Sequence, residues 1–227
     1  QWMTAGRGVQ HSEMFPLLKD DEENTLELFQ IWLNLPKAGK FVDPHFKMLW
    51  SEDIPIIEEE NAKIKVVAGT YKNVNPIDPA PDSWAANPEN EVAVWNIHVD
   101  ADSEYTLPKA NSSEVNRVLY FYEGDEIYID DKKINPNFGI VLDQTQDVNI
   151  KIGSETAHFM MLQGKPIGEP VAKYGPFVMN TQEEIQKVME EYRLTQFGGW
   201  PWPHPDNVHD KDRGRFALYP DGKLVEK

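Results

Sequence analysis

Cysteine is absent from all 227 residues of the chain. Without thiols the protein cannot form disulfides, thiolate nucleophiles, zinc–cysteine sites or iron–sulfur clusters, so any metal has to be held by His, Asp or Glu. Basic residues are also scarce, with 22 Lys plus Arg against 38 Asp plus Glu and a formal net charge of -16. Duplex nucleic acid is bound through a basic face, so we expect no direct nucleic-acid binding. Any link to DNA would run through a protein partner.

Long apolar runs are missing as well. No stretch approaches the roughly 20 apolar residues that span a bilayer, and the first residues lack the basic and apolar regions of a signal peptide. We therefore expect a cytoplasmic protein without membrane contact. Hydrophobic residues nevertheless make up 40% of the chain, which is enough for a buried core.

The pattern of apolar residues favours β structure. Phe29 to Leu35 alternates apolar and polar side chains with the period of a strand, and Ile54 to Ile57 and Ile64 to Val67 read as a hairpin with an acidic turn. Beyond a proline-rich linker, short apolar segments recur at spacings of roughly 8 to 12 residues, which is typical of an antiparallel sandwich or barrel. These segments are Val92 to Val99, Tyr105 to Leu107, Val118 to Tyr122, Glu126 to Ile129, Gly139 to Leu142, Val148 to Ile152 and Ala157 to Leu162.

One helix is expected near the end of the chain. Thr181 and Glu184 have the spacing of a capping box, and a stripe of apolar residues follows at helical intervals. The stripe consists of Ile185, Val188, Met189 and Tyr192. The tail from Phe197 onward combines two Trp with several Pro, which predicts an extended arm packed on an apolar surface.

The first thirteen residues contain the best candidates for chemistry. Gly6 and Gly8 flank Arg7 in a predicted tight turn, and His11 and Glu13 then share one face if the segment is extended. An imidazole nitrogen and a carboxylate oxygen that converge in this way suit iron, manganese, copper or zinc. On spacing alone, the alternative is a solvated strand face.

The string Gln1 to Glu13 as a whole closely resembles the signature of the pirin family. Further segments resemble this family in the same order along the chain: Leu28 to Pro36, Asp53 to Pro55, Lys65 to Gly69, Tyr120 to Gly124, and Glu169 to Asn180. The similarity covers essentially the whole chain.

The resemblance implies an all-β bicupin, with two antiparallel β-barrels of which the first is incomplete, followed by a C-terminal helix and an extended tail. The implied boundaries are 1–75 for the remainder of the N-terminal cupin, 76–90 for a linker, 91–180 for the C-terminal cupin, and 181–227 for the helix and tail. We expect the chain to act as a monomer.

The resemblance also implies one metal ion in the first barrel, held in the family by three His and one Glu. His11 and Glu13 match the third His and the Glu, whereas the His-x-His pair that supplies the other two ligands would lie before Gln1. We therefore expect this chain to be a fragment of a longer protein that binds metal weakly by itself. Iron is the expected metal, with copper, manganese, nickel and zinc as alternatives.

Two functions are consistent with this resemblance. The first is a metal-dependent dioxygenase of the quercetin 2,3-dioxygenase type, which acts on small aromatic flavonols with Glu13 as general base and is expected to be inactive as this fragment. The alternative is an iron-dependent regulatory protein that binds a transcription factor or a metabolic enzyme without turnover, and a bicupin scaffold without chemistry is a third possibility. His98 and His158 are interpreted as wall residues of the second barrel, although two inward-facing His could form a site there.

Overall fold

The computed structural model describes residues 1–15, 17–206, 208–219 and 222–227. The chain divides into two compact units, each described separately below. We call the first the sandwich unit, which consists of Gln1–Trp2 and Leu49–Gly168. We call the second the discontinuous unit, because it combines Met3–Met48 with Glu169–Lys227.

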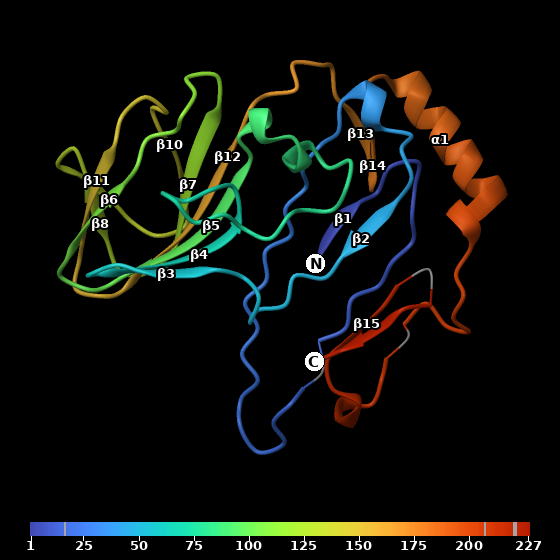
Figure 1. Cartoon of the computed structure of the whole chain (residues 1–227), viewed down its shortest axis with the longest axis horizontal. Helices are drawn as coiled ribbons and strands as arrows, with labels where there is room; N and C mark the ends of the chain where they lie inside the picture. Colours follow the sequence, from blue (N-terminus) through green and yellow to red (C-terminus); the bar gives the residue numbers. More distant parts are fainter. Residues whose placement is uncertain (16, 207, 220–221) are drawn as a thin grey trace. The chain divides into compact units, whose positions relative to one another are not determined.

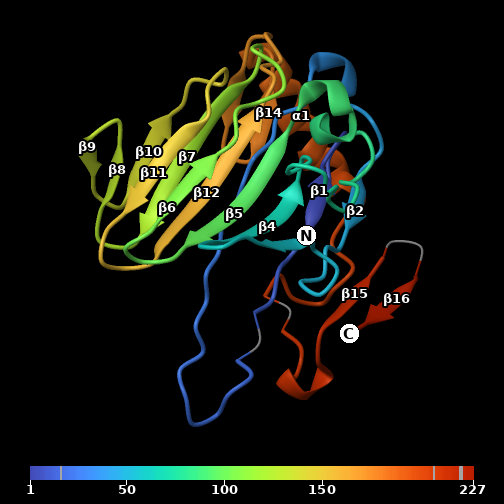
Figure 2. The ribbon, with the colours of Figure 1, turned by 60° about the vertical axis from the view of Figure 1, so that its left-hand side comes forward.

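The sandwich unit contains two antiparallel sheets, which face each other in Figures 1 and 2. The first has six strands in the order β10-β7-β12-β5-β4-β3, and the second has four in the order β6-β11-β8-β9. The strands of the first sheet are β3 (Ile56–Glu58), β4 (Ala62–Ala68), β5 (Ala93–Val99), β7 (Asn116–Glu123), β10 (Phe138–Val141) and β12 (Ala157–Gly164). Those of the second are β6 (Glu104–Leu107), β8 (Ile127–Ile129), β9 (Lys132–Ile134) and β11 (Val148–Ile152).

The interior of this unit is filled by side chains from both sheets. Along β4 the buried residues alternate with more exposed ones, as a strand with one face on a core requires. The central strand β5 is buried on both faces for most of its length. One hydrophobic cluster joins the two sheets; its fully buried members include Ile64, Ile97, Leu119 and Phe159 from the first sheet and Leu107, Ile127 and Ile150 from the second. The core therefore lies between the two layers.

The discontinuous unit is built from two-stranded sheets and one helix, and its first strand begins at Trp2, the last residue of the short first segment of the sandwich unit. Strand β1 (Trp2–Thr4) pairs with β2 (His45–Lys47), β13 (Ala172–Tyr174) with β14 (Phe177–Met179), and β15 (Phe216–Leu218) with β16 (Leu224–Glu226). Helix α1 spans Gln182–Thr195. A small core forms where Ile185 of α1 packs with Ala172 and Met179 of the β13–β14 hairpin. Short 3-10 helices of this unit occur at Lys37–Gly39, Gln196–Gly198 and Lys211–Arg213, whereas those at Trp84–Ala86 and Pro88–Asn90 belong to the sandwich unit.

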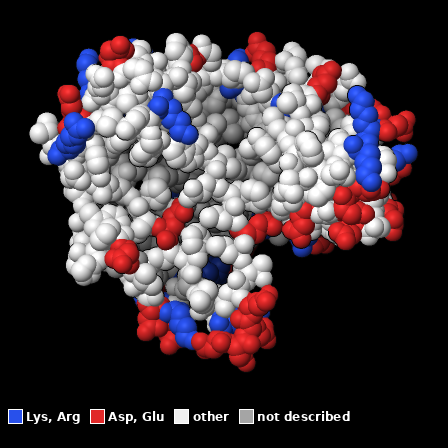
Figure 3. Space-filling view, turned by 180° about the vertical axis from the view of Figure 1, so that it is seen from behind, with Lys and Arg blue, Asp and Glu red and all other residues white. Residues whose placement is uncertain are grey.

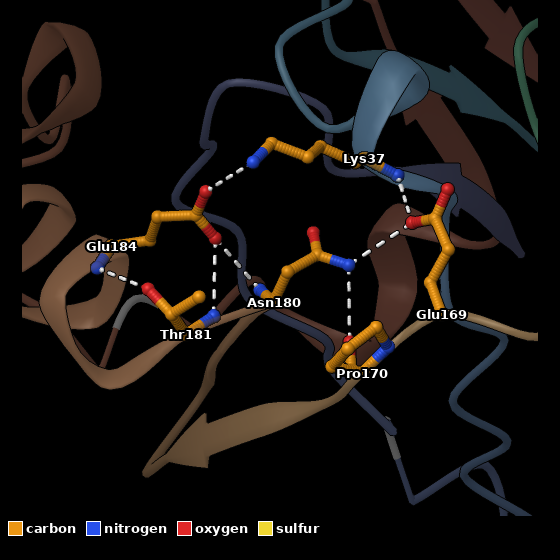
Figure 4. A network of polar contacts seen from close by, with 6 residues as sticks. All are labelled: Lys37, Glu169, Pro170, Asn180, Thr181 and Glu184. Atoms are coloured by element: carbon orange, nitrogen blue, oxygen red, sulfur yellow. Dashed lines mark hydrogen bonds and ion pairs between the residues drawn. The ribbon is translucent and has the colours of Figure 1, made fainter.

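The start of α1 is fixed by a network of polar contacts, drawn in Figure 4. The predicted capping box is confirmed: the Glu184 amide donates to the Thr181 hydroxyl at 3.2 Å, and the Thr181 amide donates to the Glu184 carboxylate at 3.1 Å. The same carboxylate contacts Lys37 Nζ at 3.0 Å and accepts from the Asn180 amide at 3.0 Å. The Lys37 ammonium in the first place, and the Asn180 amide in the second, lower the pKa of Glu184. This network joins the two chain segments of the unit, because Lys37 also donates its amide to Glu169 at 2.6 Å.

The all-β prediction is confirmed, with antiparallel sheets and one C-terminal helix. Among the described residues no sheet closes into a continuous barrel. The seven predicted segments after the linker correspond to β5, β6, β7, β8, β10, β11 and β12, and the predicted acidic hairpin corresponds to β3 and β4.

Two local predictions were wrong. Residues 29–35 form no strand. An alternating pattern permits an extended chain, but a β-strand also needs a neighbouring strand to hydrogen-bond with, and none of the described strands pairs with this segment. The tail is not simply extended, since it contains the β15–β16 hairpin.

Strands β3 and β4 hydrogen-bond in the same sheet as β5, and β4 pairs with β5 from Ala62 to Ala68. The boundaries 1–75, 76–90, 91–180 and 181–227 stay a prediction. No helix in the described part of the chain has the length and apolar character needed to cross a bilayer.

Candidate functional site

A tight turn precedes the two candidate metal ligands. Gly6 has a φ of +49°, and the Arg7 amide donates to the carbonyl of Val42 at 3.0 Å. A Cβ on Gly6 would lie 2.2 Å from that carbonyl oxygen, so only glycine fits this position. The turn predicted from the two glycines is confirmed. The Arg7 guanidinium contacts the Asp43 carboxylate at 2.8 Å. Because both side chains are largely exposed, this ion pair adds little stability.

The segment between the turn and the candidate ligands is anchored by two contacts. Gly8 has a φ of +119°, and a Cβ there would lie 2.6 Å from ring atoms of Phe197. Two residues later, the Gln10 side chain donates to the carbonyl of Gln196 at 2.6 Å. Gln196 is the C-cap of α1, so the end of the helix helps to position residues 8–10.

His11 and Glu13 point toward each other, as their spacing in an extended segment predicts. The distance from His11 Nε2 to Glu13 Oε1 is 3.9 Å, and their side chains are 45% and 27% exposed. Two donors that each bind an ion at about 2.1 Å can be at most about 4.2 Å apart, so this separation is compatible with a common ion. The donor set, one imidazole nitrogen and one carboxylate oxygen, also suits a first-row transition metal. The exposure of both side chains leaves room for further ligands.

His11 and Glu13 together supply two side chains as metal ligands. Within the described residues of the discontinuous unit, no three His, Asp or Glu side chains bring their ligand atoms within 4.8 Å of one another. Without a metal, the same geometry is that of a weak ion pair, provided that the imidazole is protonated. The assignment of His11 and Glu13 as metal ligands stays a prediction.

His98 and His158 lie side by side in the sandwich unit. They are directly paired across β5 and β12, and their ring centroids are 4.1 Å apart. In β5 the neighbours Ile97 and Val99 point into the core cluster, so His98 and the histidine opposite it lie on the other face of the sheet. Tyr122 lies on the same side, with its ring centroid 6.0 Å from that of His158. An inward-facing pair of His inside the barrel is therefore not formed.

The sequence interpretation missed a polar group inside the sandwich unit. Tyr71, Tyr105 and Arg117 are each 5% exposed or less, and the two tyrosine hydroxyls are 2.9 Å apart. For Arg117 a signal was available: it lies two positions before Leu119 and four before Phe121, so the strand period places all three on the buried face. No comparable pattern identifies the Tyr71–Tyr105 contact, which joins residues 34 positions apart.

Comparison with known proteins supports the family assignment from both ends of the chain. The family model described as Pirin matches residues 1–33, and the model described as Pirin C-terminal cupin domain matches residues 94–198. A pirin-like protein of Arabidopsis thaliana is 30% identical over 207 residues, which cover 85% of this chain and 67% of that protein. Pirin-1 of Arabidopsis thaliana is 33% identical over 204 residues, which cover 87% of this chain and 65% of that protein. Pirin of Homo sapiens is 31% identical over 203 residues, which cover 87% of this chain and 64% of that protein.

A solved structure shows the same fold. The crystal structure of quercetin 2,3-dioxygenase from Acinetobacter baumannii superposes with a TM-score of 0.62 at 25% sequence identity, covering 73% of this chain and 55% of that one. The chain spans about two thirds of the length of the curated relatives it matches. From its N-terminal signature to its C-terminal cupin, the chain belongs to the pirin family.

Proposed function

We propose that this chain forms part of a metal-dependent dioxygenase that opens the central ring of flavonols such as quercetin. The observation that carries the proposal is the 3.9 Å separation of His11 Nε2 and Glu13 Oε1 within residues 1–33, the segment that matches the Pirin family model. The structural similarity to a protein named quercetin 2,3-dioxygenase supports the reaction class.

His11 and Glu13 would hold the metal through one imidazole nitrogen and one carboxylate oxygen. Iron is the metal that we propose, with copper, manganese, nickel and zinc as alternatives. When bound, such an ion stabilises a deprotonated hydroxyl of the substrate as a Lewis acid. Glu13 has a second carboxylate oxygen, which can accept the hydroxyl proton as a general base. The turn at Gly6 and the contact of Gln10 with Gln196 fix the backbone from which both side chains project.

Two protein donors bind a divalent ion much more weakly than four, because the remaining positions are left to water. We therefore expect residues 1–227 alone to bind metal weakly and to show no turnover of quercetin. The resemblance to the family implies that a His-x-His pair from another strand would complete the ligand set. Turnover by residues 1–227 alone, abolished in Glu13→Ala, would contradict this requirement for further ligands.

Anaerobic titration with Fe(II), with the heat of binding measured by calorimetry, tests the metal site without depending on activity. His11→Ala and Glu13→Gln should each lower the affinity by at least about tenfold, because each removes one of two donors. The matched control is His204→Ala, which removes an exposed histidine in the tail. Equal affinities in His11→Ala, Glu13→Gln and the unsubstituted chain would refute the assignment.

The surface charge favours a second candidate function, an iron-dependent regulatory protein that binds a protein partner without turnover. On the face drawn in Figure 3, Asp and Glu side chains gather in clusters, with Lys and Arg scattered between them. Together with the net charge of -16, this favours a partner with a basic patch through electrostatic steering. Partner binding that weakens with salt and occurs without oxygen uptake favours this function, whereas oxygen uptake that requires Glu13 favours the enzyme.

A further inference from the structure

The sandwich unit contains a buried guanidinium. Arg117 is 1% exposed and lies near the start of β7. It alternates with Leu119 and Phe121 on the buried face of that strand, and both of these residues belong to the core cluster between the sheets. The side chain of Arg117 is therefore directed into the interior of the unit instead of toward solvent.

Nothing in the described part of the chain hydrogen-bonds this guanidinium. The Nε, Nη1 and Nη2 atoms are all buried, and none of them has a hydrogen-bond partner. Five N–H donors are thus left unsatisfied on a group that stays charged at any physiological pH. Buried charges in proteins are normally paired and hydrogen-bonded, because an unpaired charge in an apolar interior is strongly unfavourable.

The anionic and polar groups that act on Arg117 do not compensate for its charge. Burial lowers the pKa of Arg117, and the Tyr105 hydroxyl and the Asp147 carboxylate oppose this effect. Asp147 is exposed, and it already accepts a hydrogen bond from the Lys109 amide at 2.8 Å. The Tyr105 hydroxyl is hydrogen-bonded to that of Tyr71. The interior therefore has a surplus of positive charge and of donors.

We propose that the interior of the sandwich unit binds a small monocarboxylate, held by the guanidinium of Arg117. A carboxylate matches the planar fork of arginine and can accept two parallel hydrogen bonds from it. We expect the ligand to carry a single negative charge. Arg117 supplies one buried positive charge, and a second negative charge on the ligand would be left unpaired among the apolar side chains of the core.

A cavity of the sandwich unit borders Tyr105, one of the groups that act on Arg117. It has a volume of about 240 Å³, and its lining includes Tyr105, Thr106, Glu59 and Lys72. Lys72 Nζ contacts Glu59 at 2.5 Å and so neutralises one carboxylate of the lining, which also contains Glu60 and Glu104. Tyr105 belongs both to the wall of the cavity and to the groups that act on Arg117, and its side chain is the element that we expect to move when the ligand enters.

The test uses the whole chain with acetate as the probe and chloride at equal ionic strength as the reference. Acetate should raise the thermal unfolding temperature of the unsubstituted protein in a saturable way, because a ligand that binds only the folded state stabilises it. Arg117→Met should lose this rise, and in chloride it should be at least as stable as the unsubstituted protein, because it removes an uncompensated buried charge. Lys151→Met, which removes an exposed lysine from β11 of the same unit, is the matched control and should keep the full rise.

Two results would overturn the proposal. The first is an acetate effect that is equal in the unsubstituted protein and in Arg117→Met, which would make acetate a non-specific co-solute. The second is a large loss of stability in Arg117→Met without acetate, which would make the guanidinium a structural group. Arg117→Lys is an independent test: it keeps the charge but loses the planar fork, so calorimetry should show acetate binding weakened at least about tenfold, and unchanged affinity would refute the site. The proposal does not depend on the metal site, since it concerns the other unit.

Discussion

The hydroxyl of Tyr71 offers a sharp test of the polar group inside the sandwich unit. Tyr71 is fully buried, and its hydroxyl lies 2.9 Å from the hydroxyl of Tyr105 and donates to Glu59 Oε1 at 2.9 Å. Burial above all raises the pKa of both tyrosines, so both hydroxyls stay neutral throughout the accessible pH range. Tyr71→Phe removes one oxygen atom and leaves the ring packed edge-on against Trp95, whose ring centroid is 5.0 Å away.

The expected cost follows from the groups that lose a partner. Each hydrogen bond contributes about 1 kcal/mol net, and a buried hydroxyl left without a partner costs a further 1–3 kcal/mol, roughly. Tyr71→Phe breaks both bonds and orphans the hydroxyl of Tyr105, so the free energy of unfolding should fall by about 3–5 kcal/mol. Tyr105→Phe breaks one bond and leaves Tyr71 paired with Glu59, so it should cost about 1 kcal/mol.

The double substitution gives the diagnostic result. Tyr71→Phe together with Tyr105→Phe removes the orphaned hydroxyl as well, so it should cost less than the sum of the two single substitutions by at least about 1 kcal/mol. Urea unfolding followed by circular dichroism measures all three variants, and equal slopes against urea concentration show that the same surface is exposed. Tyr120→Phe is the matched control: this tyrosine is 43% exposed, and its substitution should change stability by less than about 0.5 kcal/mol. Strictly additive costs would refute the reasoning.

Three further predictions concern single positions. The Ser154 hydroxyl first, and then the backbone amide of Glu126, lower the pKa of Asp125 from 3.8 to about 2. The stability from this carboxylate is therefore present above pH 4, roughly, and is lost as the pH falls through about 2, whereas Asp125→Asn should show no such change in an acid titration followed by circular dichroism. Gly69→Ala should cost about 1–3 kcal/mol in urea unfolding, because φ is +73° and the new Cβ would lie 2.6 Å from the Val92 carbonyl oxygen. Thr181→Ala should cost about 1 kcal/mol by loss of the helix cap and Thr181→Ser much less, and equal costs for these two would show that the hydroxyl does not act as a cap.

The sequence predicted those elements whose signals are local. The capping box at Thr181 and the turn at Gly6 depend on side chains and φ values within a few residues, and both are present in the structure. The strands of the sandwich unit were predictable because each has one face on a shared core, so apolar and polar residues alternate along the sequence. The β13–β14 hairpin was missed because its short strands show no alternation of buried and exposed residues.

Predictions that depend on distant partners were less successful. The alternation in residues 29–35 is as regular as that in β4, but whether such a segment becomes a strand is decided by a neighbour elsewhere in the chain. In the candidate metal site, the shared face of His11 and Glu13 follows from a separation of two residues, whereas their distance and exposure depend on the anchoring of Gly8 by Phe197. The empty hydrogen-bonding positions of Arg117 are a property of the packed core, and no sequence pattern reports them.

The order of the two units along the chain has a consequence for synthesis on the ribosome. The sandwich unit is almost one continuous stretch, Leu49–Gly168, inserted between the two parts of the discontinuous unit. It can therefore begin to fold once Gly168 has left the exit tunnel, while Met3–Met48 still lacks the hairpin and helix supplied by Glu169–Lys227. At roughly 5–20 residues per second, the ribosome takes about 3–12 s to translate Glu169–Lys227. During that interval the nascent protein exposes the early segment to chaperones and proteases, so the lifetime of this translation intermediate, as well as the final stability, limits the yield of folded protein.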